Sequence, residues 1–470
     1  MNKIEIIIAL IYLLIVISIG IYSSKKSKDN DQLYLAGNTF SWFPLGISVM
    51  ISAFSAVNFV AFPSEIIKFG PAVLISLPVF IIVIYPLFKW FIPFFRKRKS
   101  FSAYSFLEEK YDVKTKHLAT VLFVIWRLMW ISVTLYASAK MLMVFTGIPL
   151  YIIIIVTGIT ALFYSSIGGF RAVVTTDLLQ FFILFGTICL TLGVAISNGF
   201  LSIDSLGDWF SKHPFPDDFY SFSPKVRITF WSGLTGTFIA FMARYGADQI
   251  TIQRYMAAKS EKEAKKAILL NAGAALVILT LLLLWGITVT LIPGQSSLPP
   301  LKQMVFFIQS MPTGVTGLFI AALLAASMSS IDSGLNAMSA VLSEDIKLFS
   351  TVNKGKSGTF ILGIISLTGA LILIPIMAAE GSIFVVANKI IHGFGAPILS
   401  LIVLGMFSKK ITSAGVFWGT IIGAVCSIAS VIFIKDLAVH AYVIINLVVS
   451  LSASWIISQI YNINNSKIKI

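Results

Sequence analysis

The chain has 470 residues, of which 57% are hydrophobic and 12% are charged, and its mean hydropathy is +0.92. Soluble globular domains carry about 25% charged residues, so this composition excludes a soluble multidomain enzyme. Apolar runs long enough to cross a bilayer recur from end to end, and they predict an all-α polytopic membrane protein. Continuous runs also exclude a porin-like barrel, whose strands would alternate between polar and apolar residues.

The formal charge of +15 is interpreted as cationic cytoplasmic loops rather than a nucleic-acid surface, because such loops orient membrane proteins. Cys189 and Cys426 lie in apolar runs and are expected to be small core residues. The sequence has no nucleotide-binding, metalloprotease or serine-hydrolase motif, and no pair of histidines has metal-ligand spacing. We therefore expect a protein that is not an enzyme.

Taken in chain order, the apolar runs predict thirteen membrane spans. The first run is too long for the apolar core of a signal peptide and no small-residue cleavage site follows it, so we expect a permanent span. The longest connection, 201–228, is expected to hold one short surface helix. The spans are expected at about 4–24, 44–69, 71–95, 115–147, 149–166, 174–200, 229–252, 267–293, 313–343, 358–378, 382–408, 411–434 and 438–461.

The positions of the lysines and arginines predict the orientation in the membrane. If the N-terminus lies outside the cell, most cations between spans, including the run 96–99, fall on the cytoplasmic side. The positive-inside rule favours this arrangement. We expect a multi-pass protein of the cell membrane with its N-terminus outside and its C-terminus in the cytoplasm.

The span 44–69 is interrupted by residues that disfavour a membrane helix, among them Ser52, Ser55, Asn58 and Pro63. A broken helix frees backbone carbonyls, and this is tolerated at membrane depth only where they are buried in protein or line a cavity. The freed carbonyls would suit a hard cation such as Na⁺. A packing face rich in Ser and Asn would explain the same residues, so the segment alone leaves both interpretations open.

The span 382–408 is interrupted in a similar way by Asn388, Lys389, His392 and Pro397. Paired interrupted spans in the two halves of a chain indicate an inverted repeat. We therefore expect one domain over 1–470 in which each repeat begins with a broken helix. Its parts are an extra N-terminal span at 4–24, a first repeat at 44–200, a second repeat at 229–408 and two C-terminal spans at 411–461.

The most informative polar pattern lies in span 313–343. Ser329, Ser330 and Ser333 follow helical spacing and share one face of a helix, and Asp332 lies at the edge of that face. A carboxylate inside a membrane span is costly and therefore indicates a functional site. Hydroxyl and carboxylate oxygens are the ligands that a hard cation prefers. A packing stripe of small residues explains the serines but does not explain Asp332.

Other charged residues within spans have competing explanations. Asp177 lies about one turn into its span and is either a functional carboxylate or a helix cap. Arg127, one turn from Trp130, requires a partner or a wet cavity, so it would bind an anionic substrate or pair with an internal carboxylate. Arg244 and Asp248 have i, i+4 spacing and are expected to form a structural ion pair.

Five motifs follow one another along the chain. They are PSEIIKFG (63–70), IPFFRK (92–97) with SAYSFLEEKYDV (102–113), SSIGGFRAVVTTDLLQ (165–180), DQITIQRYMAAKSEKEAKKA (248–267) and SSIDSGLNA (329–337). Together they resemble the sodium:solute symporter family, most closely its sodium/iodide–sodium/monocarboxylate and bacterial sialic acid branches. The resemblance implies the LeuT-type fold and sodium-coupled symport.

The resemblance also implies two sodium sites. The main site would use the carbonyls of Ile51, Phe54 and Ala326 and the hydroxyls of Ser329 and Ser330. The second site, known from the sialic acid branch, would use Asp177, Asp332 and Ser333 together with Ser329. Asp332 departs from that branch, which has Ser there. Either the two carboxylates would share one Na⁺ or one of them would hold a proton, so the ion count is left open.

The matching substrate positions carry two further departures from the sialic acid branch. Leu77 stands where that branch has Gln, and Trp130 stands where it has Arg, with Arg127 one turn earlier. Both departures weigh against sialic acid itself more than against a smaller acid. The residues expected to bind substrate are Ser52, Ser55, Asn58, Leu77, Arg127 and Trp130.

The function implied by the resemblance is Na⁺-coupled uptake of a small organic solute, for which we expect a carboxylate such as sialic acid or a monocarboxylate. A neutral amino acid, a sugar or a polyol stays open as the solute. A membrane-embedded receptor or enzyme lacks support, because the sequence shows neither an output domain nor a catalytic constellation. The expected partners are the solute, sodium ions and the lipid bilayer, with no nucleic acid and no obligate protein partner.

Overall fold

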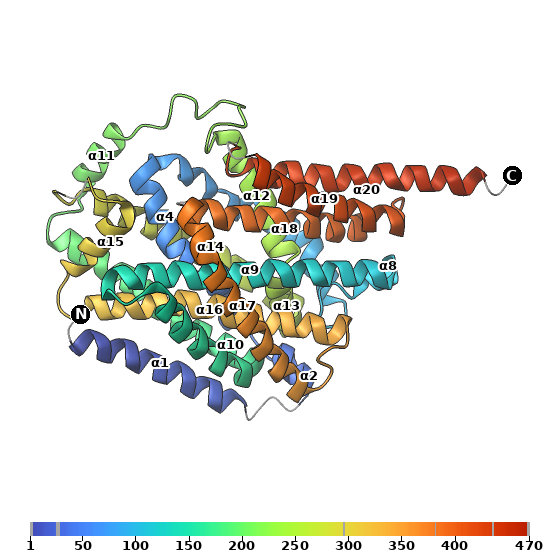
Figure 1. Cartoon of the computed structure of the whole chain (residues 1–470), viewed down its shortest axis with the longest axis horizontal. Helices are drawn as coiled ribbons and strands as arrows, with labels where there is room; N and C mark the ends of the chain where they lie inside the picture. Colours follow the sequence, from blue (N-terminus) through green and yellow to red (C-terminus); the bar gives the residue numbers. More distant parts are fainter. Residues whose placement is uncertain (1–2, 25–28, 295–296, 381, 435–436, 468–470) are drawn as a thin grey trace.

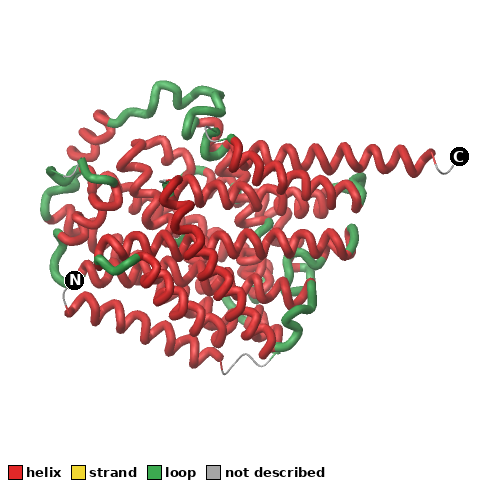
Figure 2. Tube along the Cα trace, viewed as in Figure 1, coloured by secondary structure: helices red, strands yellow, loops and turns green. Residues whose placement is uncertain are grey.

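The computed structural model describes residues 3–24, 29–294, 297–380, 382–434 and 437–467. These residues form helices and loops, and their one β-type pairing is an isolated bridge between Phe40 and Ala258. Figure 2 shows helices throughout the body of the molecule, packed mostly lengthwise. In Figure 1 the N-terminal α1 lies along one side of this body, and α20 extends past its opposite end. The expectation of an all-α membrane protein is confirmed.

The longer helices run lengthwise, and shorter ones cap the connections. The helices are α1 Lys3–Ser24, α2 Asn30–Leu35, α3 Trp42–Ala53, α4 Ala56–Phe69, α5 Val79–Ile82, α6 Ile84–Pro86, α7 Ile92–Arg96, α8 Phe106–Lys110, α9 Val113–Thr146, α10 Leu150–Ser197, α11 Ile203–Lys212, α12 Phe230–Gly246, α13 Gln249–Ala257, α14 Glu261–Thr290, α15 Pro300–Gln309, α16 Val315–Asp345, α17 Val352–Glu380, α18 Ile383–Phe407, α19 Ser413–Phe433 and α20 Ala441–Lys467. Short 3₁₀ turns, η1 Ala36–Asn38 and η2 Gly70–Ser76, and a π-helical turn, η3 Leu87–Phe91, link some of them.

Ten helical segments in the described parts of the chain are long and apolar enough to cross a membrane. The predicted count of thirteen spans is therefore not confirmed and stays a prediction. Two of the ten, Ala56–Arg96 and Leu150–Ser197, each cover two predicted spans, and the predicted span 229–252 falls on the short helices α12 and α13. At 1.5 Å per residue, α10 would extend roughly 70 Å, about twice the hydrocarbon thickness of a bilayer. Gly169, with φ at 65° and ψ at −174°, interrupts the helix.

The predicted break in the first repeat is present. α3 ends at Ala53, Phe54 and Ser55 adopt extended backbone angles, and α4 begins at Ala56. Ser55 starts α4 because its hydroxyl accepts a hydrogen bond from the amide of Val57 at 3.1 Å. The sequence signal was correct here because Ser is a poor residue within a helix and a good one at its start.

The polar residues of span 382–408 do not break its helix. α18 runs continuously through Pro397, so the expected interruption of span 382–408 is wrong for the backbone that the structure describes. Helices tolerate such residues where neighbouring groups satisfy the freed backbone. The first helix expected for the second repeat, the predicted span 229–252, is broken: α12 ends at Gly246, and Asp248 caps α13 by accepting from the amide of Ile250 at 3.0 Å.

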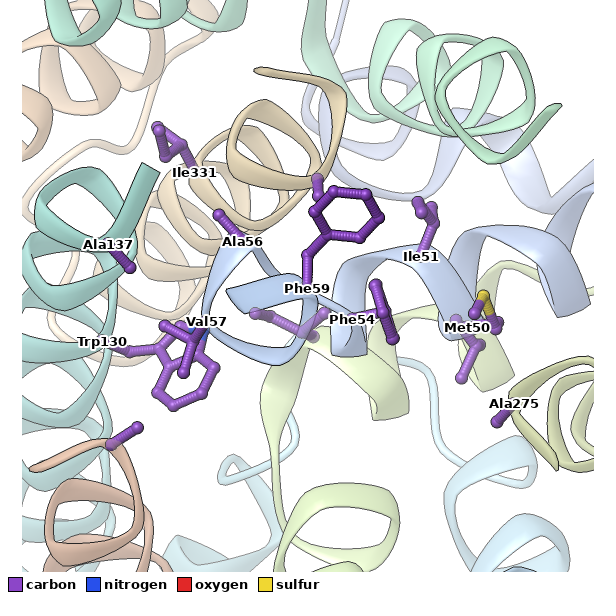
Figure 3. Packing of buried hydrophobic residues seen from close by; sticks show 14 of the residues in the cluster. Met50, Ile51, Phe54, Ala56, Val57, Phe59, Trp130, Ala137, Ala275 and Ile331 are labelled. Carbon is purple, nitrogen blue, oxygen red and sulfur yellow. The ribbon is translucent and has the colours of Figure 1, made fainter. Parts of the chain in front are cut away.

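The core is arranged around α16 and the broken helix. In the most apolar stretch of α16, 94% of the residues are buried. Figure 3 shows Met50 of α3, Phe54 of the break and Val57 of α4 packed between Trp130 of α9 and Ala275 of α14. The predicted surface helix in 201–228 is confirmed as α11, near the top of Figure 1. The break between α3 and α4 is thus held inside the bundle.

Candidate sodium and substrate sites

The carbonyls freed at the end of α3 meet side chains of α16. Ser329 of α16 donates its hydroxyl to the carbonyl of Ile51 at 3.1 Å and lies at the same distance from the carbonyl of Ala326. The hydroxyl of Ser330 donates to the carbonyl of Ser52 at 3.3 Å. The C-terminal end of a helix is the negative end of its dipole and favours a cation.

The predicted ligands of the main sodium site therefore converge in large part. Ile51 of α3 is distant in sequence from Ala326 and Ser329 of α16, and the oxygens of all three lie within one hydrogen-bonded group. Ser330 meets the next carbonyl along α3, and Phe54 lies at the break itself. Carbonyl and hydroxyl oxygens at a helix break form a donor set that fits Na⁺ by its chemistry.

The group around Asp177 forms a second, fully buried polar centre. Asp177, on α10, accepts hydrogen bonds from the hydroxyls of Ser48 at 2.5 Å and Ser52 at 3.3 Å. Ser52 in turn lies 2.7 Å from the hydroxyl of Ser333 on α16. The predicted residues Asp177 and Ser333 thus share a site with Ser52, which was expected to bind substrate.

A residue that the sequence analysis did not single out occupies the middle of this group. Arg254 of α13 places its Nη2 atom 3.2 Å from Asp177, 2.6 Å from Ser52 and 2.9 Å from Ser333. Its side chain is 1% exposed. The sequence offered little signal for it, because Arg254 stands in a basic stretch that was assigned to a cytoplasmic loop.

Asp332 lies beside the same group but has different partners. One of its carboxylate oxygens accepts from the hydroxyls of Tyr164 at 3.0 Å and Thr176 at 3.4 Å. The other oxygen is buried without a hydrogen-bond partner among the described residues, and the same holds for one oxygen of Asp177. Both aspartates are fully buried. The centre therefore holds two buried carboxyl groups, of which Asp177 is paired with Arg254 and each keeps one oxygen without a partner in the described structure.

A cavity of about 100 Å³ lies on the other side of the broken helix. Broken-helix residues on its wall include Phe54, Val57 and Asn58, and α9 contributes Trp130. Figure 3 shows the Trp130 ring beside Val57. Further walls come from η2, α5, α12, α14, α18 and His440, which directly precedes α20. The predicted residues Asn58 and Trp130 therefore face one cavity.

The arginine that lines this cavity is Arg244 rather than Arg127. Arg244 donates to the carbonyl of Ala53 at the end of α3, and its guanidinium carbon lies 5.5 Å from the centre of the Trp130 ring. No Asp or Glu is among the described residues on the cavity wall. The cavity therefore carries positive charge.

The expected ion pair between Arg244 and Asp248 is wrong. Asp248 pairs with Arg127 of α9, and both side chains are 3% exposed. The i, i+4 rule requires one continuous helix, and α12 ends at Gly246 before Asp248 is reached. This pair also decides between the two roles left open for Arg127, because its guanidinium is bound to an internal carboxylate outside the cavity wall.

Three other predicted substrate positions lie away from the cavity wall. Ser55 caps α4, and Ser52 belongs to the Asp177 group. Ser76 rather than its neighbour Leu77 lines the cavity. The segment that ends at Ser76 is the 3₁₀ turn η2, in which successive side chains are rotated differently from those of an α-helix.

Two further polar residues of span 382–408 are placed only in part. Lys389 faces a different hollow, which it shares with Arg227 and Tyr442. The side chain of His392 lies outside the described residues. Asn388, which directly precedes Lys389, lines the cavity beside the broken helix. This span therefore contributes a polar group to the cavity wall.

The sequence model of the sodium:solute symporter family matches residues 33–423, which include both polar centres and most of the cavity wall. The chain belongs to the sodium:solute symporter family. Sodium is accordingly the coupling ion, and the family resemblance expected from the five motifs is confirmed.

Relatives of similar sequence carry the names of symporters for different solutes. The chain is 27% identical over 494 residues to the sodium/sialic acid symporter NanT of Aliivibrio fischeri, covering 97% of this chain and 94% of that protein. It is 29% identical over 434 residues to the human sodium-coupled monocarboxylate transporter 2, covering 87% of this chain and 69% of that protein.

The structure also resembles a solved symporter. It matches the substrate-bound outward-open state of a Na⁺-coupled sialic acid symporter with a TM-score of 0.87 and 24% identity, over 98% of each chain. At this identity the match establishes the fold. It shows that the helices of the two chains are arranged in the same way.

Proposed function

We propose that this symporter couples inward movement of Na⁺ to uptake of a small carboxylate. The observation that carries the proposal is Arg244, which is the one Lys or Arg among the described residues on the cavity wall, facing no carboxylate there. A guanidinium binds a carboxylate strongly because it offers paired, charged donors. The N-terminus of α4, at Ala56, opens beside the same cavity and adds the positive end of a helix dipole.

The cavity favours a short monocarboxylate over sialic acid. Its volume of about 100 Å³ is well below the 300–1,000 Å³ of pockets that hold drug-sized ligands. Aromatic and aliphatic side chains such as Phe54, Val57 and Phe241 form much of its wall. Such a wall would leave the hydroxyls of a large sugar acid unpaired, and unpaired buried hydroxyls are costly. A short apolar tail fits it better.

Sodium would act by joining the broken helix to α16. The ligands we propose for this ion are the carbonyls of Ile51, Phe54 and Ala326 and the hydroxyls of Ser329 and Ser330. The contacts from Ser329 to Ile51 and from Ser330 to Ser52 support the proposal, since they bring these oxygens together. An ion held between α3 and α16 would stabilise the outward-open state and prepare the adjacent cavity for substrate. A second ion at Asp177, Asp332 and Ser333 is the two-sodium alternative.

The domain arrangement is part of the same proposal. Thirteen spans, with repeats at 44–200 and 229–408, would place the first helix of each repeat at the centre of the protein. The backbone breaks after Ala53 and after Gly246 support such a pairing. The N-terminus would lie outside and the C-terminus in the cytoplasm, as the positive-inside rule favours.

Two other classes of transported solute are alternatives to a small monocarboxylate. The name of the Aliivibrio fischeri relative makes sialic acid the second candidate, and neutral amino acids, sugars or polyols are the third. An enzyme or receptor is disfavoured by membership of a transporter family.

Uptake into proteoliposomes tests the proposal. Labelled pyruvate, lactate, sialic acid, glucose and proline are offered under an inward Na⁺ gradient, with a K⁺ gradient of equal size as the control. We expect Na⁺-dependent uptake of a monocarboxylate. Uptake of sialic acid alone would favour the second candidate, and uptake of only a neutral solute would overturn the assignment of a carboxylate.

A further inference from the structure

We propose that a hollow between α1 and α10 binds one anionic phospholipid, with the lipid phosphate at Arg171 and an acyl chain along α1. None of the described residues on its wall belongs to the proposed sodium or substrate sites. The inference goes beyond the proposed function, because it requires only that the chain spans a membrane.

The first argument is the make-up of the hollow, which has a volume of about 520 Å³. α1 packs against α10 along one side of the molecule (Figure 1). The hollow between them is lined by Leu14, Ile15 and Ile19 of α1 and by Arg171 of α10. Arg171 is the one charged residue on the described part of this wall. The hollow therefore combines an apolar surface with a single positive charge.

The second argument is the position of the hollow relative to the bilayer. In the most apolar stretch of α1 only 17% of the residues are buried, so this helix faces lipid. The stretch from Leu14 to Tyr22 extends about 12 Å along α1, close to the roughly 15 Å of hydrocarbon in one leaflet. α1 ends at Ser24, and three lysines follow in the sequence at 25–28. The hollow thus spans one leaflet and reaches its headgroups.

The third argument is the unused binding capacity of Arg171. Its Nη2 atom donates to the carbonyl of Ala36 at 3.3 Å and to the hydroxyl of Thr39 at 3.1 Å. Its Nε atom is buried without a hydrogen-bond partner, and no Asp or Glu of the described chain forms an ion pair with it. A phosphate would supply both an acceptor and the missing countercharge, and charged hydrogen bonds of this kind are strong.

The fourth argument concerns the class of lipid. Basic pockets between membrane helices on the cytoplasmic side bind anionic headgroups, and the proposed orientation places this hollow in the inner leaflet. A zwitterionic headgroup would bring its own cation to Arg171, where like charges repel. A free phosphate would use Arg171 but leave the apolar wall uncovered. An anionic phospholipid satisfies both parts of the hollow.

Counting the lipids retained by purified protein tests this inference. The protein in a neutral detergent is titrated separately with the anionic lipid palmitoyl-oleoyl phosphatidylglycerol, the zwitterionic palmitoyl-oleoyl phosphatidylcholine and inorganic phosphate, and bound molecules are counted by native mass spectrometry. We expect the wild type to retain the anionic lipid at concentrations about tenfold lower than the zwitterionic one. Arg171→Gln should retain one anionic lipid fewer and an unchanged number of zwitterionic lipids. Arg171→Lys should lose less, because it keeps the charge.

A matched arginine variant controls for the loss of one positive charge. Arg98 is half-buried like Arg171 and also donates to a backbone carbonyl, that of Phe94 at 3.3 Å, but it does not line the hollow. Arg98→Gln should retain as many anionic lipids as the wild type. An unchanged count in Arg171→Gln, or an equal loss in both variants, would overturn the inference.

A second variant avoids dependence on the folding of the Arg171 variants. Ser18 lines the hollow on the exposed face of α1, so Ser18→Phe narrows the space for the acyl chain and leaves Arg171 unchanged. It should also remove one anionic lipid. Full retention of that lipid by Ser18→Phe, or binding of inorganic phosphate at Arg171 in place of lipid, would overturn the lipid site. Neither result would alter the case for sodium-coupled uptake, which is measured separately.

Discussion

The guanidinium of Arg244 lies over the ring of Trp130, with 5.5 Å between its central carbon and the ring centre. This contact joins α12 to α9 across the cavity. It holds the one cationic side chain of the described wall beside an aromatic surface, and cation–π contacts of this kind favour a defined orientation of the guanidinium. The pair therefore offers a carboxylate a charged end and an apolar platform.

Replacing Arg244 tests its role in substrate binding. Arg244→Gln removes the charge that would bind the carboxylate, and charged hydrogen bonds contribute about 1.5–3 kcal/mol. We expect KM for the transported acid to rise roughly 10- to 100-fold. Arg244→Lys should lose less, because it keeps the charge but not the planar pair of donors. The measurement is initial uptake rate against substrate concentration at saturating Na⁺. An unchanged KM in Arg244→Gln would remove Arg244 from the substrate site.

Replacing Ser329 tests the main sodium site. Ser329→Ala removes a hydroxyl that contacts the carbonyls of Ile51 and Ala326. We expect the Na⁺ concentration for half-maximal uptake to rise about tenfold, which corresponds to the loss of ~1.4 kcal/mol. Ser327→Ala is the matched control, because Ser327 lies on the same helix but contacts Ser138 of α9. Equal sodium activation in the two variants would contradict the site.

The pair of Arg127 and Asp248 is expected to stabilise the fold. Leaving one charge of a buried pair without its partner costs about 3–5 kcal/mol, so Arg127→Met should sharply lower the melting temperature in detergent. Adding Asp248→Asn should recover part of that loss, because Asn can still cap α13 without carrying a charge. If Arg127→Met instead raised KM without affecting thermal stability, Arg127 would contact the substrate after all.

The pair of Glu65 and Arg227 ties α4 to the long connection that precedes α12. Arg227 donates two hydrogen bonds to the carboxylate, at 2.6 and 2.8 Å, and Glu65 is 3% exposed whereas Arg227 is 30% exposed. Glu65→Gln should weaken this attachment by about 1–2 kcal/mol, a value reduced for partial exposure. We expect faster cleavage of the segment 213–229 by an added protease.

The exposed pair of Glu261 and Lys265 provides the control for that experiment. Pairs of this kind contribute about 0–1 kcal/mol, so Glu261→Gln should leave the cleavage rate unchanged. Equal cleavage rates in Glu65→Gln and the wild type would show that the buried carboxylate does not hold the connection in place.

The charge carried per transport cycle follows from the ion count. Moving one elementary charge through 100 mV is worth about 2.3 kcal/mol. If one Na⁺ accompanies one monocarboxylate, the cycle is electroneutral and uptake should not change when the interior is made negative. Potential-driven uptake by the wild type would instead indicate that a second Na⁺ moves with each monocarboxylate.

Local sequence chemistry was informative where a single segment sets the outcome. The break near Ser55 was predictable because polar and helix-breaking residues act on their own backbone. The polar face of α16 was predictable because helical spacing alone places Ser329 and Ser330 together. The continuity of α18 was not predictable, since packing against neighbouring helices decides whether a helix tolerates Pro397.

The sequence by itself determined the class of protein, the family and the polar face of α16, because these depend on composition, motifs and short-range periodicity. Only the tertiary structure decided the partners of the buried charges. Arg127 pairs with a carboxylate 121 positions away, and Arg254 pairs with one 77 positions away. Such pairings depend on how distant helices pack. The cost of burying charge selects the packing that satisfies them, and this left Arg244 to face the cavity.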